Sequence, residues 1–406
     1  MNQIKSLTRN LTIRYALIQG FFWISFCSIL GFAAIFLKWK QYSTGQIGII
    51  LSLSSIGSVV LQPVVASFAD KTTKISVKNI TSLVILTNFI LGLLLLVLPN
   101  SFVVTACLFI LICSILFSLP PLLNSVALEY MNKGILLNYG LARGIGSISF
   151  AIMSYFLGFM IDAKGAIILL PFFLFASFGL TVATFTFQLS TKAKNSLNDA
   201  NILLHDPIRN KNLSKGSLIS FFLKYKKFSF HLIGITLIFT CHSMINTYLI
   251  QILEQVGGSS KHLGISLSIA AALELPTMAI YAMLARKMNS GILLKVAAFF
   301  LTIKAGILIF AFNVPMVYLS QAFQLISYAL FIPASVDYVN KIMAEEDKVK
   351  GQAFVGVATM GMSGILGNLI AGQIISNAGV TYMVITSAII SAFGFIILFF
   401  STENSY

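Results

Sequence analysis

Two charged side chains lie deep inside apolar runs, and they are the strongest candidates for chemistry in this sequence. Glu274 lies in the run 263–284, and Lys304 lies in the run 291–311. A charge at the centre of a bilayer costs roughly 3 kcal/mol on insertion scales, so such a side chain faces a cavity or a partner. We expect Glu274 to carry protons and Lys304 to line a polar cavity. A purely structural ion pair is the alternative.

Neutral polar residues at helical spacing accompany these two charges. His242 and Asn246 are four residues apart, so a helix places them on one face. Gln321 and Gln324 are three residues apart and share a face in the same way. We expect these four side chains to line a cavity for a polar solute. For His242, a hydrogen-bonded position in the core is the alternative.

Further candidates lie in the first half of the chain. Arg143 and Phe150 are seven residues apart, which is two helical turns on one face. The guanidinium of Arg143 is a rigid fork of donors that can bridge vicinal hydroxyls. Glu129 is a second candidate for carrying protons, although near the end of its run it can also snorkel to water. Asp337 lies near a helix end, and we assign it to that end.

The elements that position these residues follow from an apolar composition. The 406 residues are 57% hydrophobic and only 10% charged, with a mean hydropathy of +0.92. A soluble domain carries about 25% charged residues. This composition excludes a soluble enzyme, a disordered chain and a disulfide scaffold. The four cysteines lie in apolar runs without metal-ligand spacing, so we expect no metal and no cofactor.

Twelve apolar runs are long enough for spanning helices, which need about 20 residues each. Six precede and six follow a polar, basic interval. We expect an all-α membrane protein with an N-terminal six-helix bundle at 1–188, a basic cytoplasmic linker at 189–227 and a C-terminal six-helix bundle at 228–406. The runs lie at 15–37, 44–68, 80–98, 101–127, 139–161, 166–188, 228–252, 263–284, 291–311, 314–339, 351–375 and 380–401.

Lys and Arg are distributed unevenly between alternate loops. The termini, the linker and every second loop hold most of the 27 Lys and Arg, and the opposite side holds Lys38, Lys40, Lys164 and Lys261. The positive-inside rule therefore predicts that both termini are cytoplasmic in a multi-pass protein of the cell membrane. Because the charge lies in short loops and not on one folded face, we expect no binding of nucleic acid.

The segment from Gly48 to Asp70 and Lys71 resembles the signature that follows the second helix in the major facilitator superfamily. The equivalent loop of the second half contains Arg286. The resemblance implies the twelve-helix fold of that superfamily, with two parallel halves of six helices. It also implies that Asp70, Lys71 and Arg286 belong to a gating loop at the cytoplasmic face.

A longer stretch, PPLLNSVALEYMNKG followed by NYGLARGIGSISF, is similar to the lactose permease branch, the oligosaccharide:proton symporters. The resemblance implies that Arg143 binds sugar hydroxyls and that the aromatic ring of Phe150 stacks on the sugar. The position of the acidic partner in that branch falls at Asn124 or Ser125. In the second half, Glu274 matches the intramembrane glutamate. Lys304 stands in place of an arginine.

The tenth helix departs from that branch. Gln321, Gln324 and Ser327 stand where the branch has titratable residues. We therefore expect Glu274 to be the main coupling acid. We expect a secondary active transporter, not an enzyme, that acts as a monomer in symport of a sugar or oligosaccharide with protons. The alternatives are a proton-driven exporter of drugs or metabolites, a nucleoside symporter and a non-transporting membrane sensor. No nucleotide-binding motif is present in the sequence, which excludes ATP-driven transport.

Overall fold

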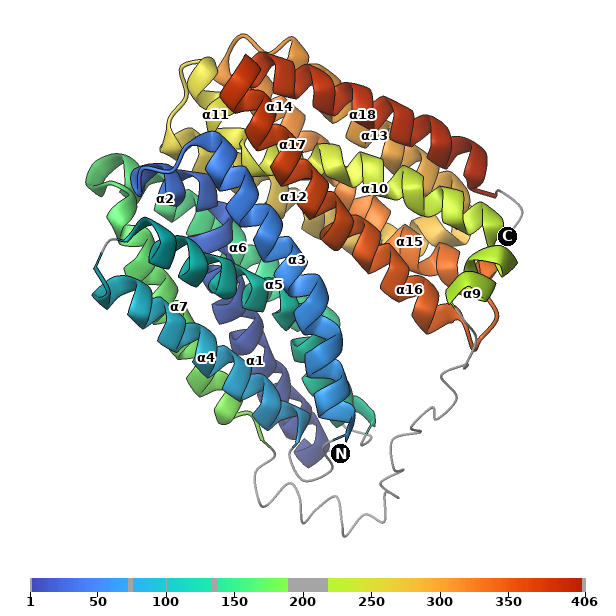
Figure 1. Ribbon diagram of the computed structural model, residues 1–406. Helices are drawn as coiled ribbons and strands as arrows, with labels where there is room; N and C mark the ends of the chain where they lie inside the picture. Colours follow the sequence, from blue (N-terminus) through green and yellow to red (C-terminus); the bar gives the residue numbers. More distant parts are fainter. Residues whose placement is uncertain (1, 72–75, 100, 133–136, 189–217, 404–406) are drawn as a thin grey trace. The chain divides into compact units, whose positions relative to one another are not determined.

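The computed structural model describes residues 2–71, 76–99, 101–132, 137–188 and 218–403, and these form helices joined by short turns (Figure 1). Twelve helical stretches are long and apolar enough to cross a membrane. The predicted fold class, an all-α membrane protein with twelve spanning helices, is therefore confirmed. Most of the predicted linker, residues 189–217, lies outside the described residues.

The helices follow the predicted runs in chain order. Those before the linker are α1 (Asn2–Phe26), α2 (Ala33–Trp39), α3 (Thr44–Lys71), α4 (Val77–Val97), α5 (Phe102–Asn132), α6 (Tyr139–Lys164) and α7 (Leu169–Phe185). Those after it are α9 (Leu218–Lys224), α10 (Lys226–Thr247), α11 (Leu249–Gln255), α12 (Ser260–Lys287), α13 (Ser290–Ile309), α14 (Val314–Ala322), α15 (Tyr328–Ile342), α16 (Lys348–Gly356), α17 (Ser363–Ala378) and α18 (Val380–Ser401).

The chain forms two compact units. The first comprises residues 1–30, 57–153 and 168–211. Within it, α4 packs against α5 and α7, and α1 packs against α7. The hydroxyls of Ser25 on α1 and Ser177 on α7 are 2.7 Å apart and buried. Polar groups within spanning helices pair with each other because the lipid offers them no partner.

The second unit comprises residues 31–56, 154–167 and 212–406. In this unit α10 packs along α18 and α17, and α13 packs against α18 and α15. Its core is a cluster of buried apolar side chains from α9, α10, α13, α15, α16 and α18. Members of this cluster include Ile235, Phe239, Leu294, Ala298, Phe331, Tyr338, Val355 and Leu398.

Two spans of the second unit are interrupted, although the sequence predicted continuous helices there. The span Val314–Ile342 ends its first helix at Ala322, continues as a 3₁₀ turn over Phe323–Leu325, and resumes at Tyr328. The span from Lys348 contains a π-helical stretch at Val357–Met362. Such breaks free backbone groups and re-aim side chains, and they are frequent at functional sites.

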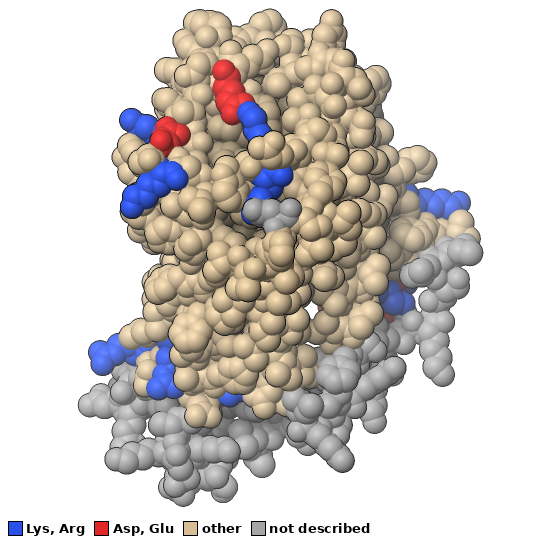
Figure 2. Space-filling model, turned by 60° about the vertical axis from the view of Figure 1, so that its left-hand side comes forward, with Lys and Arg blue, Asp and Glu red and all other residues tan. Residues whose placement is uncertain are grey.

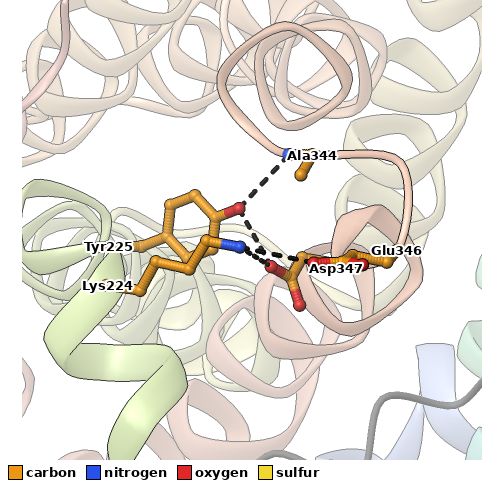
Figure 3. A network of polar contacts seen from close by, with 5 residues as sticks. All are labelled: Lys224, Tyr225, Ala344, Glu346 and Asp347. Atoms are coloured by element: carbon orange, nitrogen blue, oxygen red, sulfur yellow. Dashed lines mark hydrogen bonds and ion pairs between the residues drawn. The ribbon is translucent and has the colours of Figure 1, made fainter.

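A polar network anchors α9 to the turn between α15 and α16 (Figure 3). Asp347 Oδ2 accepts hydrogen bonds from Lys224 Nζ at 2.7 Å and from the Tyr225 hydroxyl at 3.0 Å. The Tyr225 hydroxyl also accepts from the backbone N–H of Ala344. The bond from Lys224 holds the pKa of the Asp347 carboxyl below its ordinary value. The same bond raises the pKa of Lys224. Residues 218–227 of the predicted linker are thus helical and docked.

The surface matches a chain that contacts lipid. On the face drawn in Figure 2, charged side chains gather in a few small groups, and most of the described surface belongs to other residue types. Large apolar side chains are widely exposed, among them Phe312 and Phe400. Exposed apolar patches of this extent mark interaction with a membrane or a partner.

Candidate functional site

Three polar side chains of the second unit form a hydrogen-bonded chain, Lys304–Gln324–Glu274. Lys304 on α13 is 2% exposed, and its Nζ donates to Gln324 Oε1 at 2.8 Å. The amide nitrogen of Gln324 donates to Glu274 Oε1 on α12 at 3.2 Å. The amide therefore presents its oxygen to the ammonium and its N–H to the carboxylate, so its dipole stabilises both charges.

The broken tenth span explains how Gln324 reaches both partners. Gln324 lies in the 3₁₀ turn between α14 and α15. Ser320, on the last turn of α14, donates to the backbone carbonyl of Lys304 at 2.9 Å. This bond fixes α14 against α13. The half-buried Glu274 comes from α12, whose internal Pro276 follows two residues later.

A second polar group in this unit contains His242 and Asn246 of α10. The amide nitrogen of Asn246 lies 2.8 Å from His242 Nε2. An amide nitrogen only donates, so Nε2 is the acceptor and Nδ1 carries the proton of the neutral ring. The ring stacks on Tyr328 at a centroid distance of 4.9 Å. His242 and Asn246 therefore lie on one face of α10, as predicted, and their side chains form a hydrogen bond.

Two buried donors of the candidate site in this unit have no hydrogen-bond partner among the described residues. They are His242 Nδ1 and Gln321 Nε2, and Gln321 is 1% exposed. Buried polar groups are almost always paired, so each such group calls for an explanation. A solute that presents hydrogen-bond acceptors would supply the partners.

The first unit holds the predicted binding residues of the N-terminal half. Arg143 on α6 donates to Ser147 at 3.1 Å, and its guanidinium lies 4.4 Å from the ring centroid of Trp23 on α1. Trp23 in turn meets Phe150 edge to face, with centroids 5.9 Å apart. The structure therefore brings Arg143 and Phe150 together through a residue that the sequence did not single out.

Asn124 lies in the same unit and pairs with α6. The Tyr139 hydroxyl donates to Asn124 Oδ1 at 2.8 Å. The ring of Tyr139 also contacts the buried ring of Tyr15, with centroids 6.0 Å apart. Gln19 donates to the Tyr15 hydroxyl at 2.9 Å. Tyr15 and Gln19 were also missed. Gln19 could have been found by the rule that placed Gln321, because it is a polar residue deep in a span.

The remaining candidates lie at helix ends. Glu129 is half-buried in the last turn of α5, and Arg286 is exposed in the last turn of α12. Asp70 and Lys71 end α3, and their side chains lie outside the described parts of the chain. Among the residues that are described, no group of three or more His, Cys, Asp or Glu could hold a metal ion.

The class of protein follows from this architecture. Twelve helices that could span a membrane, an interrupted tenth span that carries Gln324, and the buried Lys304 bonded to it define a polytopic membrane protein. The model of the MFS_1 like family matches residues 12–385. The chain therefore belongs to this family, and it is a transporter of small solutes and not an enzyme.

Individual relatives agree with the family. The chain is 25% identical over 351 residues, or 82% of its length, to an uncharacterized transporter, YwbF, of Bacillus subtilis (strain 168), of which the match covers 80%. Its fold is similar to that of a mutant of the nucleoside transporter NupG, with a TM-score of 0.81, 13% identity and coverage of 97% of this chain and 100% of that one. A bacterial homolog of the human lysosomal transporter Spinster has a TM-score of 0.66 at 12% identity, covering 98% and 97% of the two chains.

Proposed function

We propose that the chain is a secondary active transporter that moves a sugar or oligosaccharide together with a proton. It would act as a monomer in the cell membrane, with both termini in the cytoplasm. In alternating access, the protein exposes its solute site to one side of the membrane and then to the other. The observation that carries the proposal is the buried chain Lys304–Gln324–Glu274.

That chain is suited to proton coupling because one of its ends gains and loses charge. When Glu274 takes up a proton, its attraction for Lys304 through the Gln324 amide disappears. The free energy of the polar group then differs between the two protonation states. A ligand or proton shifts a conformational equilibrium only by such a difference between states. Glu274 is therefore our proposed coupling acid, and Glu129 is a second candidate.

The side chains of the first unit support a solute with hydroxyls and a ring face. The forked guanidinium of Arg143 suits vicinal hydroxyls, and aromatic rings such as Phe150 suit the apolar face of a ring. A nucleoside is the second candidate solute. It is favoured by the guanidinium of Arg143 lying 4.4 Å from the centroid of the Trp23 ring, a pairing of flat groups that suits a base, and by the fold similarity to NupG.

The proposal is tested by uptake into proteoliposomes of purified protein. Radiolabelled lactose and uridine serve as probes, with and without an inwardly directed proton gradient. We expect the wild type to accumulate one of them only when the gradient is present. Glu274→Gln resembles the protonated state, so it should exchange solute across the membrane but not accumulate it.

The matched control is Glu254→Gln. Glu254 is an exposed acid that pairs with Lys38 at 2.8 Å, so its loss should leave accumulation unchanged. Accumulation by Glu274→Gln at the wild-type level would overturn proton coupling through this residue. Efflux that needs an opposed proton gradient would instead identify an exporter, and saturable binding without any flux would identify a sensor.

A further inference from the structure

Trp23 has an unusual place in the first unit. It lies in the interior of the span Thr8–Gly31, which begins in α1. Its indole Nε1 is buried without a hydrogen-bond partner among the described residues. Tryptophan within proteins usually pairs its N–H when it is buried. Tryptophan in membrane proteins also concentrates at the two interfaces and not deep in a span. Packing alone therefore accounts poorly for this residue type at this position.

The neighbours of Trp23 are groups suited to binding a ring. Arg143 lies over one face of the indole at 4.4 Å, and Phe150 meets its edge at 5.9 Å. Both flanking residues come from α6. The N–H donors of Arg143 and of the Trp23 indole thus occur together beside the rings of Trp23 and Phe150. A ring that carries hydroxyl or carbonyl oxygens matches this combination of donors and apolar faces.

Space for the indole is provided by a glycine of α6. A Cβ at Gly146 would lie 2.5 Å from Trp23 Cδ1 and 3.0 Å from Nε1. Any larger residue would push the ring from its place. By contrast, a Cβ at Gly20, in the same α1–α6 contact, would meet only the Ser149 hydroxyl at 3.2 Å, and that side chain can rotate away. The fold thus leaves room for the Trp23 ring itself.

We propose that Trp23 is a solute-binding residue. Its indole N–H donates a hydrogen bond to an oxygen on the ring of the solute, and its face holds the guanidinium of Arg143 flat so that the fork points at neighbouring oxygens. This inference rests on the proposed function and deepens it. It names the substrate class as a ring that offers hydrogen-bond acceptors at its edge.

The chain provides its own reporter for this site, because Trp23 and Trp39 are its 2 tryptophans. Trp39 lies on α2, is 42% exposed, and has Lys40 over its ring. In purified Trp39→Phe, all tryptophan emission comes from Trp23. We expect titration with lactose or uridine to change that emission, with half-saturation at the concentration that half-saturates the thermal shift of the same protein. In Trp23→Phe, the emission of Trp39 should stay constant.

The second measurement is the affinity of the protein for whichever probe, lactose or uridine, it binds. Trp23→Phe keeps an aromatic ring but removes the N–H, so it should raise the Kd of the bound probe about tenfold, as expected for loss of one hydrogen bond. Gly146→Ala should weaken binding by at least about tenfold. The matched control Gly20→Ala should stay within about twofold of the wild type. Because Trp39→Phe leaves the site intact, the emission test does not depend on the folding of the site variants.

The outcomes separate this inference from the proposed function. A thermal shift with either probe, together with silent Trp23 emission and an unchanged Kd in Trp23→Phe, overturns the role of Trp23 alone. Equal weakening by Gly146→Ala and Gly20→Ala also overturns it, since helix packing would then explain both. No thermal shift with either probe contradicts the proposed solute class, and the Trp23 assignment falls with it.

Discussion

Lys304 and Glu274 should be energetically coupled although no direct ion pair joins them. The two hydrogen bonds through Gln324, at 2.8 and 3.2 Å, place the charges at most about 8 Å apart. At an effective dielectric constant of about 20, charges at that distance attract by about 2 kcal/mol. We therefore expect Lys304→Met and Glu274→Gln to be non-additive by about 2 kcal/mol in a double-mutant cycle, because each removes the same interaction.

The assay is the free energy of unfolding in mixed micelles, measured for the wild type, both single variants and the double variant. The pair Lys38–Glu254 is the matched control. Its ion pair is shorter, at 2.8 Å, but its side chains are 54% and 43% exposed. Exposed pairs contribute below about 1 kcal/mol, and salt screens them. Raising the ionic strength should reduce the control coupling and leave that of Lys304 and Glu274 unchanged, since Lys304 is buried.

Two results would refute this account of the buried chain. One is additivity of Lys304→Met and Glu274→Gln within about 0.3 kcal/mol. The other is a coupling that decreases with salt as the control does. Gln324→Leu adds an independent check, because each charge then loses its hydrogen bond to the amide. We expect that variant to lose about 1–3 kcal/mol of stability.

Three further predictions concern other parts of the chain. The hydrogen bond from Lys224 lowers the pKa of Asp347, so this group stabilises the fold above its ordinary pKa and loses that contribution as the pH falls through the lowered one. Thermal unfolding should show a decrease in Tm below about pH 4 that is smaller in Asp347→Asn. Arg143→Lys should weaken binding of the probe by at least about tenfold in the thermal-shift titration, since an ammonium has no fork; an equal Kd would assign Arg143 a structural role. A single cysteine at 195–215, in a background without other cysteines, should react only from the cytoplasmic side; labelling from outside intact cells would reverse the predicted orientation.

The spanning helices could be predicted from the sequence because lipid imposes one solution on the backbone. Every N–H and C=O in the bilayer must be paired within the protein, so an apolar run of about 20 residues becomes a helix. The predicted run 80–98 corresponds to α4 at Val77–Val97, and the run 380–401 to α18 at Val380–Ser401. For these two helices the deviations occur at the ends, where capping determines the first and last residues. Ser76, for example, starts α4 by accepting a hydrogen bond from the backbone of Asn79.

The polar residues of the candidate site could be predicted in part, for the same reason. A charge or an amide inside a span is costly unless it has a partner, which singles out Lys304 and Gln324. Their mutual contact was less predictable, because the sequence indicated one continuous helix over 314–339. The break at Phe323–Leu325 contains neither Gly nor Pro. It comes from tertiary contacts, such as the bond from Thr277 to the backbone carbonyl of Leu325 at 2.6 Å.

Trp23 could not be predicted because its significance depends on which helices are neighbours. An apolar aromatic residue in an apolar helix carries no periodic signal, and most such residues pack in the core or face lipid. Only the α1–α6 contact places it beside Arg143 and Phe150. The sequence gives one indication: Trp23 lies deep in a span, whereas tryptophan in membrane proteins concentrates at the interfaces.

An amide between the two charges has a consequence that a direct ion pair lacks. If Glu274 contacted Lys304 directly, protonation of the acid would leave a buried ammonium without a partner, which is strongly destabilising. With Gln324 in between, the ammonium keeps its bond to the amide oxygen in both protonation states. The neutral acid can still accept from the amide N–H through its carbonyl oxygen. Protonation then removes the long-range attraction but no hydrogen bond. Protonation of Glu274 would therefore change the free energy of this polar group only modestly and would be easily reversed. Each cycle of a proton-coupled transporter requires such reversibility.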